Sequence, residues 1–163
     1  MPTILEGGYA TPPGQFAIVA ARFNSLVVEP LIQGALDALR RHGVADAAVT
    51  LVRVPGSYEI PLVAGRLARS GHFAAVICLG AIIRGDTDHY DYVAGAAASG
   101  IAQAGLDAEV PVIFGVLTCN TLEQALDRAG GKAGNKGAEA AVCAIEMVNL
   151  LAKLPPALDL PTR

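Results

Sequence analysis

The chain reads AAVICLGAIIRGDTDHYDY over residues 74–92, an apolar run that passes into a polar loop with glycines and a histidine. A short run rich in β-branched residues and bounded by glycine is typical of a buried strand, so residues 74–79 are expected to form one. In open parallel sheets, ligands bind outside the carboxyl ends of the strands, where glycine lets the backbone approach them closely. The stretch therefore predicts a strand that leads into one side of a binding site.

Three further apolar runs of the same kind occupy residues 15–21, 48–54 and 112–117. They alternate with segments whose apolar residues recur at helical spacing, and strands that alternate with helices form parallel sheets covered by helices. A chain of 163 residues is long enough for one core but short for two ordinary domains. The sequence therefore predicts a single-domain three-layer α/β/α sandwich with a central four-stranded parallel sheet, which is the flavodoxin-like class.

The helices are expected between and after these strands. The first has its apolar face over residues 28–39, with Pro30 in its first turn and Gly43 at its end. The second begins near Ile60 and stops at Gly71. The others are expected at residues 88–104, at 122–129 and, after a Gly/Lys loop at 130–137, up to residue 154. The domain then covers residues 15–154, with an N-terminal extension at 1–14 and a C-terminal tail at 155–163.

The last helix is apolar around most of its circumference, because its strongly polar residues form one narrow stripe: Glu139, Glu146, Asn149 and Lys153. Such a helix has to be buried on two sides, and no later segment of appreciable length is expected to cover the second side. The whole chain has 53% hydrophobic and 17% charged residues, against a usual charged share of about a quarter. Both observations predict a homo-oligomer with a sizeable interface.

Charge and hydropathy exclude several kinds of partner. The net charge is −3 and no long Lys/Arg block occurs, so neither a nucleic acid nor a membrane is expected as a partner. No apolar run approaches the roughly 18 residues of a membrane span, and the first residues lack the features of a secretion signal. A cytoplasmic protein that acts on a small molecule is expected. The three cysteines, Cys78, Cys119 and Cys143, lack metal-ligand spacing and are interpreted as small core residues.

Loops of distinctive composition follow all four predicted strands. They read RFN at residues 22–24, PGSYE at 55–59, GAIIRGDTDH at 80–89 and TCN at 118–120. Because parallel strands bring their carboxyl ends to one edge of the sheet, an aromatic ring, a carboxylate and an imidazole are expected to meet there.

His89 is the strongest catalytic candidate, because it lies near an expected helix N-terminus. The helix dipole there disfavours the imidazolium and keeps a neutral base available for proton transfer. The alternative is a surface histidine bonded to a turn, and the glycine-rich strand end favours the catalytic role. His42 and His72 each adjoin a glycine that ends a helix, and they are interpreted as cationic residues at helix C-termini.

Two more candidates follow the first and second predicted strands. Phe23 belongs to an aromatic set of only 5% of the chain, and it is suited either to stacking on a planar heterocycle or to core packing. Glu59 is suited to accepting hydrogen bonds from ligand hydroxyls, or to favouring the positive end of the second helix, which alone is the better explanation.

A basic, glycine-rich segment lies before the last helix. Arg128, Lys132 and Lys136 recur at four-residue intervals and offer positive charge and backbone amides to an anion such as phosphate. A solvated basic turn explains the same pattern equally well. The segment is not a nucleotide P-loop, since no Gly-Lys-Ser/Thr ends it and no strand directly precedes it.

Several separated motifs, in order and without large gaps, resemble the lumazine synthase family. They are ARFN at residues 21–24, PGSYEIP at 55–61, residues 79–92, PVIFGVL at 111–117, residues 128–137 and AIEM at 144–147. The resemblance implies an enzyme of riboflavin synthesis that condenses 5-amino-6-(ribitylamino)uracil with 3,4-dihydroxy-2-butanone 4-phosphate. The product implied is 6,7-dimethyl-8-ribityllumazine, and neither a metal nor an organic cofactor is implied.

The resemblance also implies roles for residues that bind the uracil. Phe23 would stack on the pyrimidine ring, and the ring edge would meet Ala81, Ile82 and Ile83. The ribityl chain would be held by Ser57, Tyr58 and Glu59.

The remaining implied roles concern proton transfer and the phosphate. His89 would transfer protons, and Arg128 would bind the phosphate close to the loop pair Asp86 and Thr87. Lys132 and Lys136 would be basic residues near the site. Phe114 and Arg128 would come from the adjacent subunit of a homo-oligomer built on pentamers.

Two positions depart from the family pattern. A carboxylate at Asp86 would repel a phosphate, so this side chain is expected to point outward and to leave only its backbone N–H for binding. Ser57 and Tyr58 replace a common Ala-Phe pair, and the tyrosine hydroxyl needs a partner or water if it is buried.

Two other functions fit the same architecture. A flavodoxin-like flavin carrier would have a first loop rich in Ser, Thr and Gly, which RFN at residues 22–24 is not. A catalytically silent relative that binds flavin or forms a shell is the second alternative, and the presence of His89, Arg128 and Phe23 argues against it.

Overall fold

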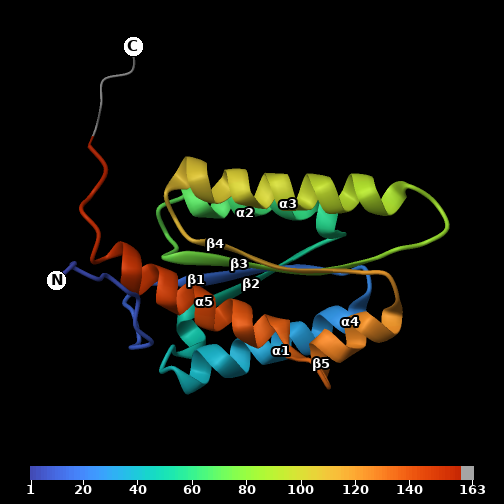
Figure 1. Ribbon diagram of the computed structural model, residues 1–163, viewed down its shortest axis with the longest axis horizontal. Helices are drawn as coiled ribbons and strands as arrows, with labels where there is room; N and C mark the ends of the chain where they lie inside the picture. Colours follow the sequence, from blue (N-terminus) through green and yellow to red (C-terminus); the bar gives the residue numbers. More distant parts are fainter. Residues whose placement is uncertain (159–163) are drawn as a thin grey trace, which may run out of the picture.

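The computed structural model describes residues 1–158, and its centre is a sheet of four parallel strands (Figure 1). In spatial order the strands are β2 (Val49–Val54), β1 (Phe16–Ala21), β3 (Ala75–Ile83) and β4 (Val112–Cys119). Each strand pairs in parallel with its neighbours. The sheet confirms the predicted flavodoxin-like sandwich.

Helices cover both faces of the sheet. On one face lie α1 (Ser25–Arg41), α4 (Leu122–Arg128) and α5 (Lys136–Leu151), and on the other lie α2 (Ile60–Arg69) and α3 (His89–Ala108) (Figure 1). Two 3₁₀ turns, Asp46–Ala48 and Ser57–Glu59, come before β2 and α2. The basic segment before α5 forms a small hairpin of β5 (Ala129–Gly131) and β6 (Gly134–Asn135), where only a loop was expected.

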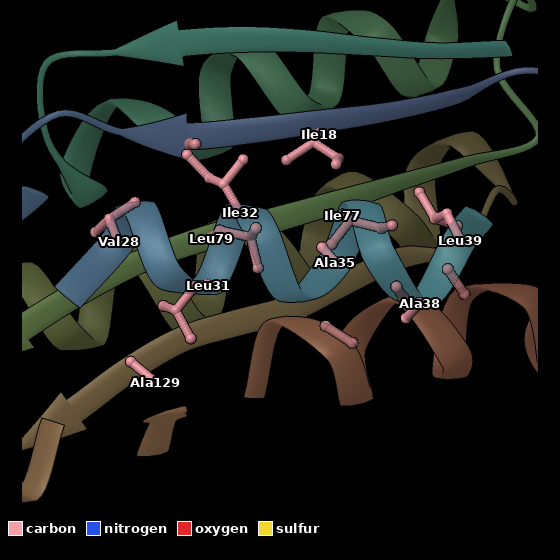
Figure 2. Packing of buried hydrophobic residues seen from close by; sticks show 14 of the residues in the cluster. Ile18, Val28, Leu31, Ile32, Ala35, Ala38, Leu39, Ile77, Leu79 and Ala129 are labelled. Atoms are coloured by element: carbon pink, nitrogen blue, oxygen red, sulfur yellow. The ribbon is translucent and has the colours of Figure 1, made fainter. Parts of the chain in front are cut away.

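The sheet has two apolar cores because side chains alternate between its faces. Along β1, Phe16 and Ile18 lie in the core under α1 and α5, whereas Ala17 and Val19 lie in the core under α2 and α3. Figure 2 shows the first core, where one stripe of α1 packs against the central strands through Val28, Leu31, Ile32, Ala35, Ala38 and Leu39. A fully buried Leu or Ile contributes about 1.5–3 kcal/mol, so this stripe holds α1 in place.

The third strand runs four residues beyond its predicted end, so residues 80–83 are strand rather than loop. They continue because β4 pairs with them as far as Ile83, opposite Cys119. Gly80 lies inside the strand, where a Cβ atom would come within 2.5 Å of the Ser57 hydroxyl. The glycine therefore lets the turn before α2 pack closely on β3.

Helix α1 also corrects a prediction. It begins at Ser25, so Pro30 lies in its second turn and not in its first. Proline lacks an N–H, and its ring prevents the usual hydrogen bond to the residue four positions earlier. The Pro30 carbonyl accepts a hydrogen bond of 3.0 Å from Asn135 Nδ2, which ties α1 to the start of α5.

The N-terminal extension contacts the polar stripe of the last helix, which the sequence did not predict. Asn149 Nδ2 donates to the carbonyls of Gly8 at 2.7 Å and Ala10 at 2.8 Å. Lys153 Nζ donates to the carbonyl of Glu6 at 2.7 Å. The polar stripe of the last helix is therefore used to bind the chain's own first residues. The predicted tail at 155–163 lies partly outside the described residues.

The cysteines divide into two groups. Cys78 and Cys119 are buried as predicted, and burial raises the pKa of the Cys78 thiol to about 12. Cys143 is exposed, and its interpretation as a core residue was wrong, because it lies on the face of α5 beside β4 and not under the sheet. No helix within residues 1–158 is long and apolar enough to cross a membrane.

Candidate functional site

Two adjoining cavities lie at the carboxyl ends of β1 and β3. The first, the strand-end cavity, has a volume of about 220 Å³ and is lined by residues of the β1–α1 loop, β3 and the start of α3. The second, the Tyr58 cavity, has about 390 Å³ and includes Gly56, Tyr58, Glu59 and Tyr92. Phe23, Ser57 and His89 line both cavities. The predicted meeting of an aromatic ring, a carboxylate and an imidazole is therefore present.

His89 is the first residue of α3. Its backbone N–H donates to Thr87 Oγ1 at 3.4 Å, and its side chain lines both cavities. The N-terminus of a long helix presents partial positive charge, as expected from the sequence. The imidazole thus lies where it can exchange a proton with a molecule in either cavity. His42, in contrast, contacts the Ala38 carbonyl through Nδ1 at 2.7 Å, which is the helix-end role predicted for it.

Phe23 is 68% exposed, so core packing is not its role. The ring rests against Gly56, where a Cβ atom would come within 2.6 Å of Phe23 Cδ2, and the Phe23 N–H donates to the Pro55 carbonyl at 3.0 Å. The next residue, Asn24, has a left-handed backbone with φ 60°. These contacts hold the Phe23 ring at the cavity, and its exposed face remains open for stacking.

Asn24 has a structural role that the sequence pattern did not assign. Its side-chain Nδ2 donates to the Ala81 carbonyl at 2.7 Å, so it fastens the Phe23 loop to β3. Asn is one of the few residue types that tolerate the left-handed conformation. The only sequence signal for this role was the place of Asn24 shortly after a strand. Ala81, Ile82 and Ile83 line the strand-end cavity beside it.

The turn before α2 brings three polar residues to the cavities. Ser57 is only 6% exposed and is the buried polar residue among those described. The Gly56 N–H donates to Glu59 Oε2 at 3.0 Å, so the Glu59 carboxylate caps the 3₁₀ turn that precedes α2. Tyr58 is 62% exposed, so its hydroxyl reaches solvent and needs no buried partner.

In the loop after β3, the two neighbours of Asp86 line a cavity and Asp86 does not. Gly85 and Thr87 line the strand-end cavity, whereas Asp86 is exposed and is not among the lining residues. The outward orientation of the Asp86 carboxylate stays a prediction.

Three further candidates lie elsewhere, in a groove of about 380 Å³ between β4 and α5 that we call the β4 groove. Phe114, Arg128 and Lys136 line it, and Phe114 is 45% exposed. Arg128 Nη1 donates to the Gln124 carbonyl at 2.9 Å, and Lys136 pairs with Glu139 at 2.7 Å. Lys132 lies outside the groove and pairs with Asp127 at 3.6 Å. Within one chain, Phe114, Arg128 and Lys136 therefore line a different hollow from the one that His89 lines.

Cys119 and Arg128 both line the β4 groove. Burial raises the pKa of the Cys119 thiol, and the neighbouring Arg128 guanidinium opposes that effect. Within residues 1–158, no three His, Cys, Asp or Glu side chains gather in a way that could hold a metal ion. The residues that line the cavities and the groove offer groups for proton transfer, anion binding and stacking.

A family model described as 6,7-dimethyl-8-ribityllumazine synthase matches residues 14–152. The chain belongs to the lumazine synthase family. The match covers the four strands of the main sheet and the five α-helices described within residues 1–158, so the resemblance carried by the separated motifs is confirmed. Membership of the lumazine synthase family places the protein in riboflavin synthesis, as a transferase that acts on small molecules.

Proposed function

We propose that this protein condenses 5-amino-6-(D-ribitylamino)uracil with (S)-3,4-dihydroxy-2-butanone 4-phosphate. The products are 6,7-dimethyl-8-ribityllumazine, phosphate and water, in the penultimate step of riboflavin synthesis in the cytoplasm. The observation that carries the proposal is the pair of cavities that share Phe23, Ser57 and His89, in a chain of the lumazine synthase family.

The lining of the strand-end cavity supports its assignment to the uracil. Its ring stacks on the exposed face of Phe23, and its edge meets the end of β3 at residues 81–83, where backbone groups offer hydrogen bonds. The ribityl chain extends into the Tyr58 cavity, where its hydroxyls meet Ser57, Tyr58 and Glu59. Glu59 then has two roles, because one of its oxygens already caps the turn before α2.

The reaction needs protons to move at several steps. The uracil's amine attacks the ketone carbon, a carbon–nitrogen bond forms, and water leaves to give an imine. Loss of a proton from C3 and of phosphate from C4 then gives an enol, which tautomerises to a new carbonyl at C3. The second nitrogen closes the ring on this carbonyl with loss of a second water. His89 accepts and returns the protons, since it lies at the junction of the two cavities.

The phosphate is bound by groups from two chains. Gly85 and Thr87 offer backbone and hydroxyl donors from the His89 side, and Asp86 contributes only its N–H. Arg128 comes from the β4 groove of an adjacent subunit, together with Phe114, while Lys132 and Lys136 add positive charge nearby. We therefore propose a homo-oligomer built on pentamers, with each active site at a subunit interface.

The direct test is to mix the purified protein with both substrates and follow the coloured bicyclic product by absorbance. Turnover that requires both substrates supports the proposal. A protein that binds one flavin per chain without turnover would instead be the silent, flavin-binding relative.

A further inference from the structure

Arg84 follows the last residue of β3 and opens the long loop that leads to α3 (Figure 1). Its backbone N–H donates to the Cys119 carbonyl at 2.9 Å, which extends the pairing of β3 and β4 by one residue. Its side chain contacts neither cavity and has no role in the function proposed above. It is half exposed, so burial in the core does not explain its contacts.

The Arg84 guanidinium joins three elements. Nε donates to Asn120 Oδ1 at 3.2 Å, in the loop after β4. Nη2 contacts Asp91 Oδ1 at 3.4 Å, in the first turn of α3, and the guanidinium carbon lies 4.3 Å from the centre of the Tyr90 ring. Asn120 is itself fixed, because its N–H donates to Gln124 Oε1 at 2.9 Å. The arginine therefore anchors the start of α3 to the end of β4.

The segment between these anchors is the one that borders the strand-end cavity. Outside the helix ladder, the hydrogen bonds described for residues 85–88 are both local: His89 N–H to Thr87 Oγ1, and Asp91 N–H to the Asp88 carbonyl at 3.0 Å. A short exposed segment with only local bonds samples many conformations unless its ends are fixed. Arg84 fixes one end directly and the other through Tyr90 and Asp91.

We propose that Arg84 is a positioning residue, which holds the loop 85–88 and the start of α3 so that Thr87 and His89 face the cavity. This inference rests on the proposed function. A planar guanidinium can stack on a ring and donate to two acceptors at once, which an ammonium group cannot do. Asp91 neutralises the charge of Arg84, so Arg84 acts on the phosphate only through the loop.

The test compares Arg84→Met, Arg84→Lys and Asn120→Ala with the wild type, varying each substrate in turn. Displacing the loop weakens binding of the phosphorylated substrate, so Arg84→Met is expected to raise its KM by about tenfold or more. The KM for the ribitylaminouracil stays close to wild type, because Phe23 and Ser57 are on other elements and residues 81–83 are held by their pairing with β4. Arg84→Lys and Asn120→Ala each keep some of the contacts made by Arg84, so they are expected to give intermediate KM values for the phosphorylated substrate.

Arg40→Met is the matched control, because Arg40 also forms an exposed ion pair, with Asp46, far from the cavities. Its kinetics are expected to match wild type. An unchanged KM for the phosphorylated substrate in Arg84→Met, or an equal rise in both KM values, overturns the inference. If Arg84→Met does not fold, Asn120→Ala decides by the same criteria.

A second readout does not depend on turnover. Amide hydrogen exchange over residues 85–92 is expected to be several-fold faster in Arg84→Met and Asn120→Ala than in wild type. Unchanged exchange contradicts the positioning role of Arg84 even if the wild-type protein is inactive. An inactive wild type with faster exchange in the variants contradicts the proposed function alone.

Discussion

His89 has a surface position that depends little on its own contacts. Its ring lines two cavities, and its backbone begins a helix of 20 residues whose buried side chains lie further along. Changing the ring should therefore alter chemistry and leave packing intact.

We predict that His89→Ala lowers kcat by about a hundredfold, which is the lower range for loss of a proton-transfer group. The melting temperature and the size of the assembly should stay as in wild type. Stopped-flow absorbance with both substrates at saturation measures the change. His72→Ala is the control, because His72 is exposed in the turn after α2. Equal kcat for the two variants would refute the role of His89.

Residue types and their spacing predicted Phe23, His89 and Glu59 at one edge of the sheet. They did not predict Asn24 or Arg84, because the partners of these side chains are 57 and 36 residues away, at Ala81 and Asn120. Such contacts depend on strand register, which a single sequence does not specify. The exposure of Cys143 escaped prediction for a similar reason, since the face of α5 that contacts the sheet follows from packing.

At the scale of elements, α1 and α5 approach closely at one glycine. A Cβ atom added to Gly137 would clash with the Leu31 carbonyl, and both residues are buried. The backbone carbonyl cannot move without disturbing the apolar stripe of α1.

We therefore predict that Gly137→Ala lowers the free energy of unfolding by about 2–3 kcal/mol, as overpacking does in cores. Gly65→Ala is the matched control, because a Cβ atom there comes nearest to the flexible end of Arg69, at 3.2 Å, and meets Ala104 Cβ at an ordinary contact distance of 3.7 Å. That change should stay within about 1 kcal/mol of wild type. Urea unfolding of the three proteins measures the difference, and equal midpoints would contradict the close contact.

A second contact between elements gives a dependence on pH. Arg53 on β2 donates to Glu29 on α1, and this hydrogen bond lowers the pKa of the Glu29 carboxyl below its usual 4.5. A carboxyl with a lowered folded-state pKa stabilises the fold above pH 4.5, and this stability is lost as the pH falls through the folded-state value.

The pair is well exposed, so its contribution is at most about 1 kcal/mol. We predict that Arg53→Met is less stable than wild type by this amount at pH 7. At a pH below the folded-state pKa of Glu29, the two proteins are expected to be equally stable. The gap between the two proteins should thus close on acidification, as measured by urea unfolding at each pH. A gap that is constant with pH would assign the effect to packing of the arginine stem.

The order of strands and helices was predictable because apolar spacing and glycine mark each element locally. The ends of elements were not, since β3 is extended by its pairing with β4 and α1 starts five residues before Pro30. The hydrogen bonds from Asn149 and Lys153 to residues 6–10 also escaped prediction, because they join the two ends of the chain.

At the scale of the whole molecule, one chain carries two parts of the proposed site in different places. His89 lies at the strand-end cavity, and Arg128 lies in the β4 groove on the far side of β4. A neighbour that brings its β4 groove to the cavities would complete each site, and the exposed Phe114 would then be covered. The central claim is that His89 and Arg128 of different chains act on one substrate pair.

Subunit complementation tests this claim most directly. His89→Ala and Arg128→Ala subunits are co-expressed with different tags, purified through both tags, and assayed beside each variant alone. With random mixing, about a quarter of the shared sites contain both intact groups, because each site takes one group from each of two chains. The account predicts that the mixed assembly regains about a quarter of wild-type turnover, well above either variant alone. Turnover in the mixture no higher than the average of the two variants would contradict it.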